Sequence, residues 1–133
     1  MNEVETIMVK DVATVSKNDT VMDAVNVMSM RNVSCVVVVD GKKPIGILTA
    51  GDVEKRLVAD KRDYKSTKVN EIMTSPIITI KPETNIIYAG KLMRQKYIKK
   101  MPVEKNGILI GIITQSGVLD ALLLNISSEL FDA

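Results

Sequence analysis

The spacing of apolar residues divides the chain into helical and extended segments. Between residues 21 and 28, apolar side chains recur at i, i+3, i+4 and i+7, which predicts a helix with one apolar stripe. Thr20 and Asp23 have the spacing of a capping box at its start. The run CVVVVD at 35–40 lacks polar alternation and predicts a strand buried on both faces. A turn, DGKKP, separates it from a second strand, IGILT, at 45–49.

The same pattern occurs twice along the chain. Residues 7–57 align with residues 72–122 without a gap, at a constant offset of 65. The phrase GILTAGD at 46–52 returns as GIITQSG at 111–117, with Asp52 matched by Gly117. A gapless match of this length indicates an internal duplication.

Each copy predicts the order strand, helix, strand, strand, helix. The opening strands are DVATV and PIITI, and the central strands lie in CVVVVD and KKMPVEK. This order predicts an α/β (α+β) protein with β-α-β-β-α repeats at 1–58 and 72–133 and a charged linker at 59–71. Neither half has enough chain to bury a core comfortably, so the halves are expected to pack on each other. The final helix is expected to continue through the last ten residues, which contain Phe131.

Composition excludes several classes of chemistry. The 133 residues contain no His and one Cys. Ser-His-Asp catalysis, Cys-His catalysis and an intramolecular disulfide are therefore excluded. Metal sites built from thiolate or imidazole ligands are nearly excluded. Cys35 lies in an apolar run and is expected to be a buried hydrophobe. The chain is therefore not expected to be an enzyme.

Charge and hydropathy bear on partners and location. The net charge of +2 does not indicate nucleic-acid binding, although Lys96, Lys99 and Lys100 form a basic cluster. No apolar run approaches the roughly 20 residues that span a bilayer, and the acidic N-terminus does not resemble a secretory signal. A cytoplasmic location, with no membrane partner, is the default expectation. A homodimer is predicted from apolar helix residues that one copy would leave uncovered, namely Met22, Met30, Leu119 and Leu123.

The chain resembles a pair of cystathionine-β-synthase (CBS) domains, or Bateman module, because the G-h-h-T-x-x-D order is repeated. The residues that carry the resemblance are VVVVDGKKPIGILTAGDV in one copy and MPVEKNGILIGIIT in the other. The resemblance covers about residues 7–123. It implies a pseudo-twofold disc with two clefts between the repeats, dimerisation, and regulatory sensing of AMP, ADP, ATP or S-adenosylmethionine. Such a ligand would be regulatory and not a catalytic cofactor. The chain is expected to be a stand-alone module.

The resemblance also implies which residues line each cleft. It assigns to the first cleft Gly46, Thr49, Ala50, Asp52, Thr74, Pro76, Ile77, Ile78, Ile98, Met101 and Pro102. It assigns to a weaker second cleft Val12, Ala13, Val33, Val36, Lys100 and Thr114. The second cleft has no carboxylate, and the first has Cys35 where the second has the basic Lys100.

The chemistry of an adenosine fits part of this set, with a structural alternative at each point. A carboxylate such as Asp52 can accept hydrogen bonds from both ribose hydroxyls, and a helix N-terminus suits phosphate oxygens. Thr49 and Asp52 also have the spacing of a capping box that needs no ligand. Gly46 could serve only close packing. The apolar residues Ile77, Ile78, Ile98 and Met101 would be core in most folds.

Two functions are therefore compared. The first is a regulatory CBS pair that binds an adenine nucleotide or adenosyl compound and acts on a partner protein. The alternative is a ligand-free scaffold with degenerate clefts, kept for its dimer surface. If Asp52 holds ribose, the first cleft should be the tighter site for adenosine.

Overall fold

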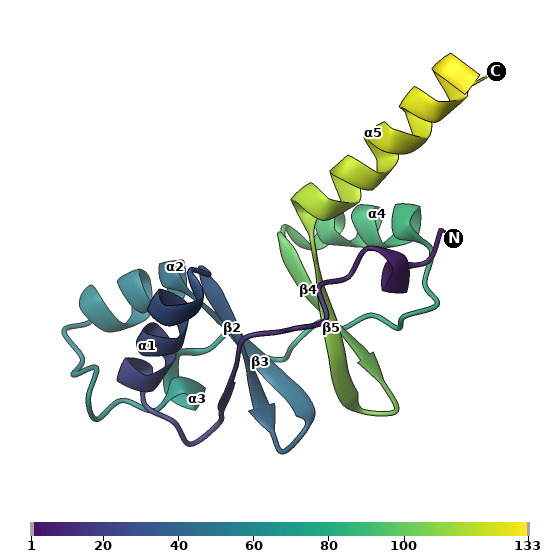
Figure 1. Cartoon of the computed structure of the whole chain (residues 1–133). Helices are drawn as coiled ribbons and strands as arrows, with labels where there is room; N and C mark the ends of the chain where they lie inside the picture. The colour runs from purple at the N-terminus through teal and green to yellow at the C-terminus, as the bar shows by residue number, and fades with distance from the viewer. Residues whose placement is uncertain (1, 133) are drawn as a thin grey trace. The chain divides into compact units, whose positions relative to one another are not determined.

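The chain forms two compact units that do not coincide with the two sequence repeats. The computed structural model describes the backbone of residues 2–132 and the side chains of residues 2–124. One unit, here called the central unit, comprises Val12–Ile77; the other, the terminal unit, comprises Met1–Asp11 together with Ile78–Ala133. Figure 1 shows a two-stranded hairpin with its helices in each unit. Each repeat therefore contributes its leading residues to the unit that holds the other repeat's hairpin.

The central unit contains a three-stranded sheet in the order β1-β2-β3. β1 pairs parallel to β2, and β2 pairs antiparallel to β3. The unbroken apolar run in β2 is buried, as predicted, and so is Cys35 at its start. Its elements are β1 (Thr14–Ser16), α1 (Val21–Arg31), β2 (Cys35–Asp40), β3 (Lys43–Thr49), α2 (Ala50–Val53), the π-helix η2 (Glu54–Val58) and α3 (Val69–Ile72).

Helix α1 begins at a capping box, as the sequence predicts. The Thr20 side chain accepts from the Asp23 N–H, and the Asp23 carboxylate accepts from the Thr20 N–H. The next two N–H groups of the first turn bond to the segment between the repeats. The Val21 N–H donates to Thr67 O and the Met22 N–H to Tyr64 O, each at 2.9 Å. These bonds satisfy donors that a helix N-terminus leaves without an intrahelical partner.

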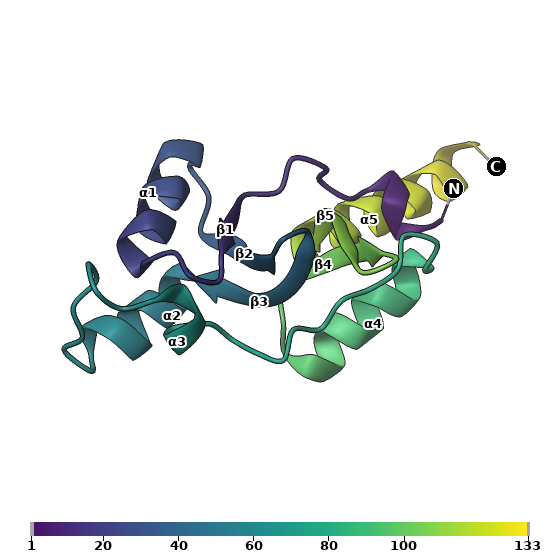
Figure 2. The same ribbon diagram turned by 90° about the horizontal axis from the view of Figure 1, so that it is seen from below.

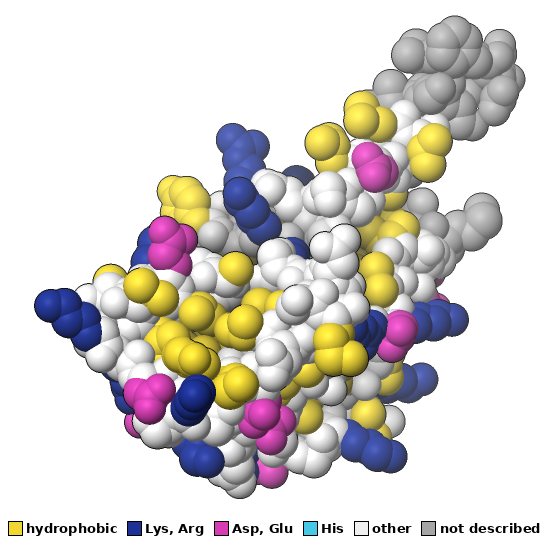
Figure 3. Space-filling model, turned by 60° about the vertical axis from the view of Figure 1, so that its left-hand side comes forward, with side chains coloured by type: hydrophobic (Ala, Val, Ile, Leu, Met, Phe, Trp, Pro, Cys, Tyr) yellow, Lys and Arg dark blue, Asp and Glu magenta, His cyan; other side chains and the backbone are white. Residues whose placement is uncertain are grey.

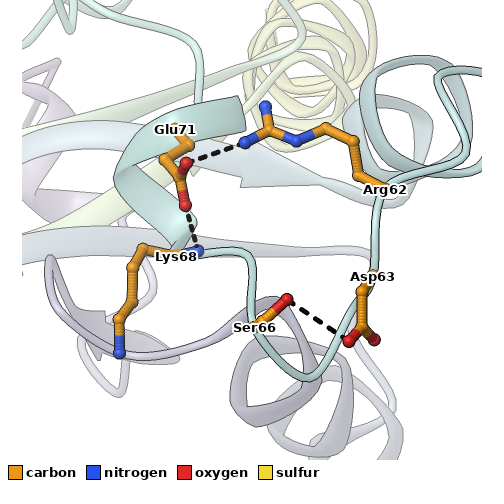
Figure 4. Close-up of polar contacts among 5 residues, drawn as sticks. All are labelled: Arg62, Asp63, Ser66, Lys68 and Glu71. Atoms are coloured by element: carbon orange, nitrogen blue, oxygen red, sulfur yellow. Dashed lines mark hydrogen bonds and ion pairs between the residues drawn. The ribbon is translucent and has the colours of Figure 1, made fainter.

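That segment, residues 59–71, is held by its own polar contacts. Figure 4 shows the Glu71 carboxylate between the Arg62 guanidinium, at 2.7 Å, and the Lys68 backbone N–H, at 2.6 Å. The Asp63 carboxylate accepts from the Ser66 hydroxyl at 3.3 Å. These side-chain contacts lie within the segment, and its backbone carbonyls at Tyr64 and Thr67 join it to the start of α1.

The terminal unit contains the antiparallel hairpin β4–β5 and two long helices. Helix α5 continues to Asp132, as predicted; the side chain of Phe131 lies outside the described residues. No helix among the described residues is long and apolar enough to cross a membrane. The elements of this unit are the 3-10 helix η1 (Val4–Thr6), α4 (Ile86–Lys96), β4 (Lys100–Lys105), β5 (Ile108–Thr114) and α5 (Gln115–Asp132).

The opening strand expected at 76–80 is reduced to a single parallel bridge between Ile80 and Val103. In the central unit the Val37 N–H donates to Ala13 O at 2.9 Å, and the residue at the position of Val37 in the second repeat is Pro102. Proline has no N–H to donate. The ladder therefore starts only where the Ile80 N–H reaches Pro102 O at 3.0 Å. The mixed α/β class and the remaining element order are confirmed.

The N-terminal segment completes the terminal unit. Val9 and Ile112 exchange two backbone hydrogen bonds, of 2.9 and 3.0 Å, beside β5 (Figure 2). Val4 is fully buried among residues of α4, β4 and β5. In the central unit, Thr74 exchanges the corresponding pair of bonds with Ile47, at 2.8 and 3.1 Å. The duplication thus extends to the way each leading segment joins the edge of a hairpin.

Candidate functional site

The closing motif of the first repeat forms a reciprocal cap where β3 meets α2. The Thr49 N–H donates to Asp52 Oδ2 at 2.9 Å, and the Asp52 N–H donates to Thr49 Oγ1 at 3.1 Å. Asp52 is half-buried. The structural alternative for this motif is therefore real: the two side chains cap the helix with no ligand present.

Capping leaves part of the Asp52 carboxylate available. The Thr74 hydroxyl lies 3.3 Å from Asp52 Oδ1 and 3.5 Å from Oδ2. An ionised carboxylate offers about four acceptor positions, and these contacts together with the Thr49 N–H leave room for a further donor. The backbone pairing of Thr74 with Ile47 places its hydroxyl there. The central unit thus brings an acceptor and a hydroxyl together at the edge of its sheet.

Two neighbours of this cluster have structural roles. The Ala50 N–H donates to Ser34 O at 2.9 Å, so it is already engaged and is not aimed at a phosphate oxygen. A Cβ on the buried Gly46 would collide with the Met73 side chain at its Sδ atom. Gly46 therefore allows the segment before Thr74 to approach β3 closely, which accounts for this glycine without a ligand.

The remaining residues expected in the first cleft divide between the units. Pro76 is exposed and Ile77 is half-buried, and both belong to the central unit. The terminal unit contains four more that are buried or half-buried: Ile78, Ile98, Met101 and Pro102. Met101 has no exposed surface and is part of the hydrophobic core. A role for these residues beside an adenine base stays a prediction.

Residues expected in the second cleft are likewise divided. Val12, Ala13, Val33 and Val36 belong to the central unit, whereas Lys100 and Thr114 belong to the terminal unit. Val36 is fully buried and Ala13 nearly so, because both pack in the central core. Lys100 is half-buried at the start of β4. Their binding roles also stay predictions.

The second repeat has only half of the cap. The Gly117 N–H donates to Thr114 Oγ1 at 2.9 Å, which matches the bond from Asp52 to Thr49. No carboxylate returns to the Thr114 N–H from position 117, since that residue is glycine. The position of Thr74 is also different in this repeat, because the offset of 65 places Val9 there. The positions that match Asp52 and Thr74 therefore supply neither the acceptor nor the hydroxyl in the second copy.

Arg56 belongs to the central cluster and was not identified from the sequence. Its guanidinium Nη1 donates to Ile72 O and Met73 O, each at 3.1 Å, next to Thr74. A signal was available: the offset matches Arg56 with Ala121, so this residue differs between the repeats together with Asp52 and Thr74. Over the described residues, no group of three or more His, Cys, Asp or Glu side chains is placed to hold a metal ion.

Comparison with known proteins places this geometry in a family. The family model for the CBS domain matches residues 4–59 and again 69–124. The CBS domain-containing protein YhcV of Bacillus subtilis (strain 168) is 34% identical over 113 residues, which cover 85% of this chain and 80% of YhcV. The mitochondrial CBS domain-containing protein CBSX3 of Arabidopsis thaliana is 36% identical over 118 residues, which cover 85% of this chain and 57% of CBSX3. The chain thus spans little more than half of CBSX3.

One similar solved structure carries ligands. It is the CBS domain pair of protein MJ0100 in complex with 5′-methylthioadenosine and S-adenosyl-L-methionine. It superposes with a TM-score of 0.81 at 25% sequence identity, covering 92% of this chain and 97% of that chain. A CBS pair of this fold therefore binds adenosyl compounds in at least one relative.

Proposed function

The chain belongs to the CBS domain family, and we propose that it is a regulatory protein that binds an adenine nucleotide or adenosyl compound at Asp52. The ligand is AMP, ADP, ATP or S-adenosylmethionine, and the protein performs no chemistry on it. With no histidine and with its only cysteine buried, the chain offers neither imidazole nor an accessible thiol for catalysis. Binding instead shifts the population of conformations or assemblies that a partner protein recognises.

The observation that carries this proposal is the state of the Asp52 carboxylate. Oδ2 is held by the Thr49 N–H at 2.9 Å, whereas the nearest donor to Oδ1 is the Thr74 hydroxyl at a longer 3.3 Å. A ribose presents two vicinal hydroxyl donors, and a charge-assisted bond to one of them is about twice as strong as a neutral one. Capping fixes the carboxylate without using all of its acceptors, so the two roles are compatible.

Adenosine binding is proposed at one place per chain. The terminal unit has Gly117 and Val9 where the central unit has Asp52 and Thr74, so it presents neither the acceptor nor the hydroxyl. Lys100 belongs to the weaker second cleft, and a phosphate contact from it stays a separate proposal that applies only to phosphate-bearing ligands. The expected stoichiometry for ribose-dependent binding is therefore one ligand per chain.

Self-association is the second part of the proposal. Four apolar side chains singled out from the sequence are all at least 38% exposed: Met22, Met30, Leu119 and Leu123. Figure 3 shows hydrophobic side chains exposed along the described part of α5. A groove between α4 and α5 is mostly apolar, and its basic residues Lys91 and Arg94 would complement the exposed Asp120 on α5 of a second copy. We propose that a second copy covers this face.

Sedimentation tests the assembly. A particle of about twice the 14.6 kDa chain mass at micromolar concentration is expected, and Leu119→Glu should shift it toward the single-chain mass. Met30→Glu tests the predicted dimer residue in the other unit, which is more exposed than Leu119, at 86% against 54%. A wild-type protein that sediments as a monomer would refute this part.

Calorimetric titration tests the site, with AMP and S-adenosylmethionine as probes. Asp52→Ala should weaken binding by about 10- to 150-fold, the equivalent of losing a charge-assisted hydrogen bond of roughly 1.5–3 kcal/mol. Asp23→Ala is the matched control, because Asp23 forms the same kind of cap on α1 and should leave affinity unchanged. If neither probe binds the wild-type protein or raises its melting temperature, the ligand-free scaffold is the correct function.

A further inference from the structure

Arg56 ties the segment that carries Thr74 to the helix that carries Asp52. Helix α3 is a single turn, and its last carbonyls lack intrahelical donors. The exposed Arg56 side chain donates from one nitrogen to two of these carbonyls, Ile72 O and Met73 O, at 3.1 Å each. A cationic donor at a helix C-terminus makes a charge-assisted bond and also interacts favourably with the helix dipole.

This anchor lies directly before Thr74. The backbone of Thr74 is fixed on one side by Ile47, through bonds of 2.8 and 3.1 Å. On its other side the chain is fixed by Arg56 at Met73 O. Because the Thr74 backbone is held by Ile47 and the preceding carbonyl by Arg56, the Thr74 side chain can do little more than rotate. Its hydroxyl lies 3.3 Å from Asp52 Oδ1.

Arg56 lies in the π-helix η2, Glu54–Val58. The Ala59 N–H, just after this helix, donates to Glu54 O at 3.1 Å and closes a wider turn than in an α-helix. Such widened turns are frequent at functional sites. In the second repeat the matching residues, 119–123, are plain α-helix within α5, and Ala121 replaces Arg56.

Four features therefore occur together in the central unit and are replaced together in the terminal unit: the carboxylate, the hydroxyl, the arginine and the π-turn. A helix cap alone needs neither the hydroxyl, nor the arginine, nor the π-turn, since Thr114 and Gly117 form a one-sided cap without them. The two main-chain carbonyls that accept from Arg56 belong to Ile72 and Met73, which are identical in the other repeat as Ile7 and Met8. The arginine is thus specific to the copy that has the acceptor.

We propose that Arg56 is a positioning residue for the ligand site: by holding the carbonyls before Thr74, it sets the Thr74 hydroxyl against Asp52 and so sets ligand affinity. This inference rests on the proposed function, because it assigns Arg56 to the same site. Arg56 acts through Thr74 and does not itself contact the ligand.

Calorimetry with AMP and S-adenosylmethionine on a double-mutant cycle tests this. Arg56→Met keeps the aliphatic length but removes the guanidinium, and should weaken binding by about 2- to 30-fold, the range of coupling through an intermediate residue. Arg56→Lys retains a cationic donor and should recover part of the loss. Lys55→Met, on the neighbouring exposed position of η2, is the matched control and should leave affinity unchanged.

The Thr74→Val background separates positioning from simple stability. There, Arg56→Met should have no further effect on affinity, because the group it positions is gone. An equal loss in both backgrounds, or a lowered melting temperature with unchanged affinity, would overturn the inference.

A ligand-free measurement keeps the two proposals distinguishable. Hydrogen exchange of the Thr74 amide, which donates to Ile47 O, should be faster in Arg56→Met than in Lys55→Met. If the wild-type protein binds neither probe, the proposed function fails, and this exchange rate still decides whether Arg56 holds the segment. Unchanged exchange would refute the role of Arg56 whatever the ligand.

Discussion

Asp23 and Asp52 cap two different helices of the central unit with the same geometry. In each case the carboxylate accepts from a threonine N–H at 2.9 Å, and the threonine hydroxyl accepts from the aspartate N–H at 3.1 Å. They differ in their surroundings: Asp23 is exposed, whereas Asp52 is half-buried and the Thr74 hydroxyl approaches its carboxylate. The cap at Asp23 can therefore serve as a control for the cap at Asp52, which has a further donor beside it.

The first prediction concerns stability at this pair. Asp23→Ala and Asp52→Ala should each lower the free energy of unfolding, the latter by about 1 kcal/mol, because each removes one side of a capping box. Urea titration at neutral pH measures both. A loss several times larger at Asp52 than at Asp23 would mean that Asp52 has a structural role beyond the cap.

The second prediction concerns the packing of Gly46 against Met73. Gly46→Ala should destabilise the protein by about 1–3 kcal/mol, since the added methyl overlaps the Met73 side chain in a packed region. In a Met73→Ala background the same substitution should cost much less, so the two changes should be strongly non-additive in thermal or urea unfolding. Gly51→Ala is the control: its Cβ would meet only Thr49 Oγ1, at 3.6 Å, and should not destabilise. Additive costs would show that Met73 does not set the requirement for glycine.

Much of this fold could be predicted because the repeat and the apolar periodicities record it directly. The buried β2 strand, the cap at Thr20 and the burial of Cys35 all follow from local pattern. The assignment of each leading segment to the other repeat's hairpin does not, because residues near Met8 and Met73 show only that they are apolar. Nothing local states which edge of which sheet they join.

The missed features involve partners that leave no mark on the sequence. Pro102 is visible in the chain, but its effect depends on the register that aligns it with the opening strand. Arg56 lies in a charged, exposed stretch that suggests a solvated helix face, and the groups it contacts are backbone carbonyls, which every residue has. Contacts of a side chain with main chain are the least predictable part of such a site.

The third prediction concerns acid. The Thr20 N–H holds the pKa of Asp23 below its ordinary value of 3.8, and the Lys68 N–H, with Arg62, holds the pKa of Glu71 below 4.5. A carboxyl whose pKa is lower in the folded state contributes stability above the unfolded value, and this contribution is lost as pH falls through the folded one. The free energy of unfolding should therefore fall as the pH decreases below about 4.5.

The variant Asp23→Asn combined with Glu71→Gln isolates these two groups. It should be less stable than the wild type at neutral pH, with a shallower loss in acid, because two groups that bind protons on unfolding are removed. Urea midpoints measured from pH 7 down to pH 3 provide the comparison. An acid slope equal to that of the wild type would assign the acid sensitivity to other carboxyl groups.

The last prediction restores the missing carboxylate. Gly117→Asp should let position 117 accept from the Thr114 N–H as Asp52 does from Thr49, and it also removes a glycine from the first turn of α5. A net gain of about 0.5–1 kcal/mol in unfolding free energy is expected, reduced by the 3.0 Å approach of the new Cβ to Thr114 Oγ1. Gly117→Ala measures the backbone part alone, so the difference between the variants is the contribution of the carboxylate.

Ligand stoichiometry in Gly117→Asp then decides what defines the site. With Val9 in place of Thr74 and Ala121 in place of Arg56, the new carboxylate has neither the hydroxyl nor the anchored segment beside it. Calorimetry with AMP should therefore still give one ribose-dependent ligand per chain. A second site of comparable affinity would mean that the carboxylate alone is sufficient, and that Thr74 and Arg56 are dispensable for binding. An unchanged stoichiometry together with the gain in stability would separate the two roles of the repeated motif: the cap requires only its own four residues, whereas binding requires the segment that Arg56 holds in place.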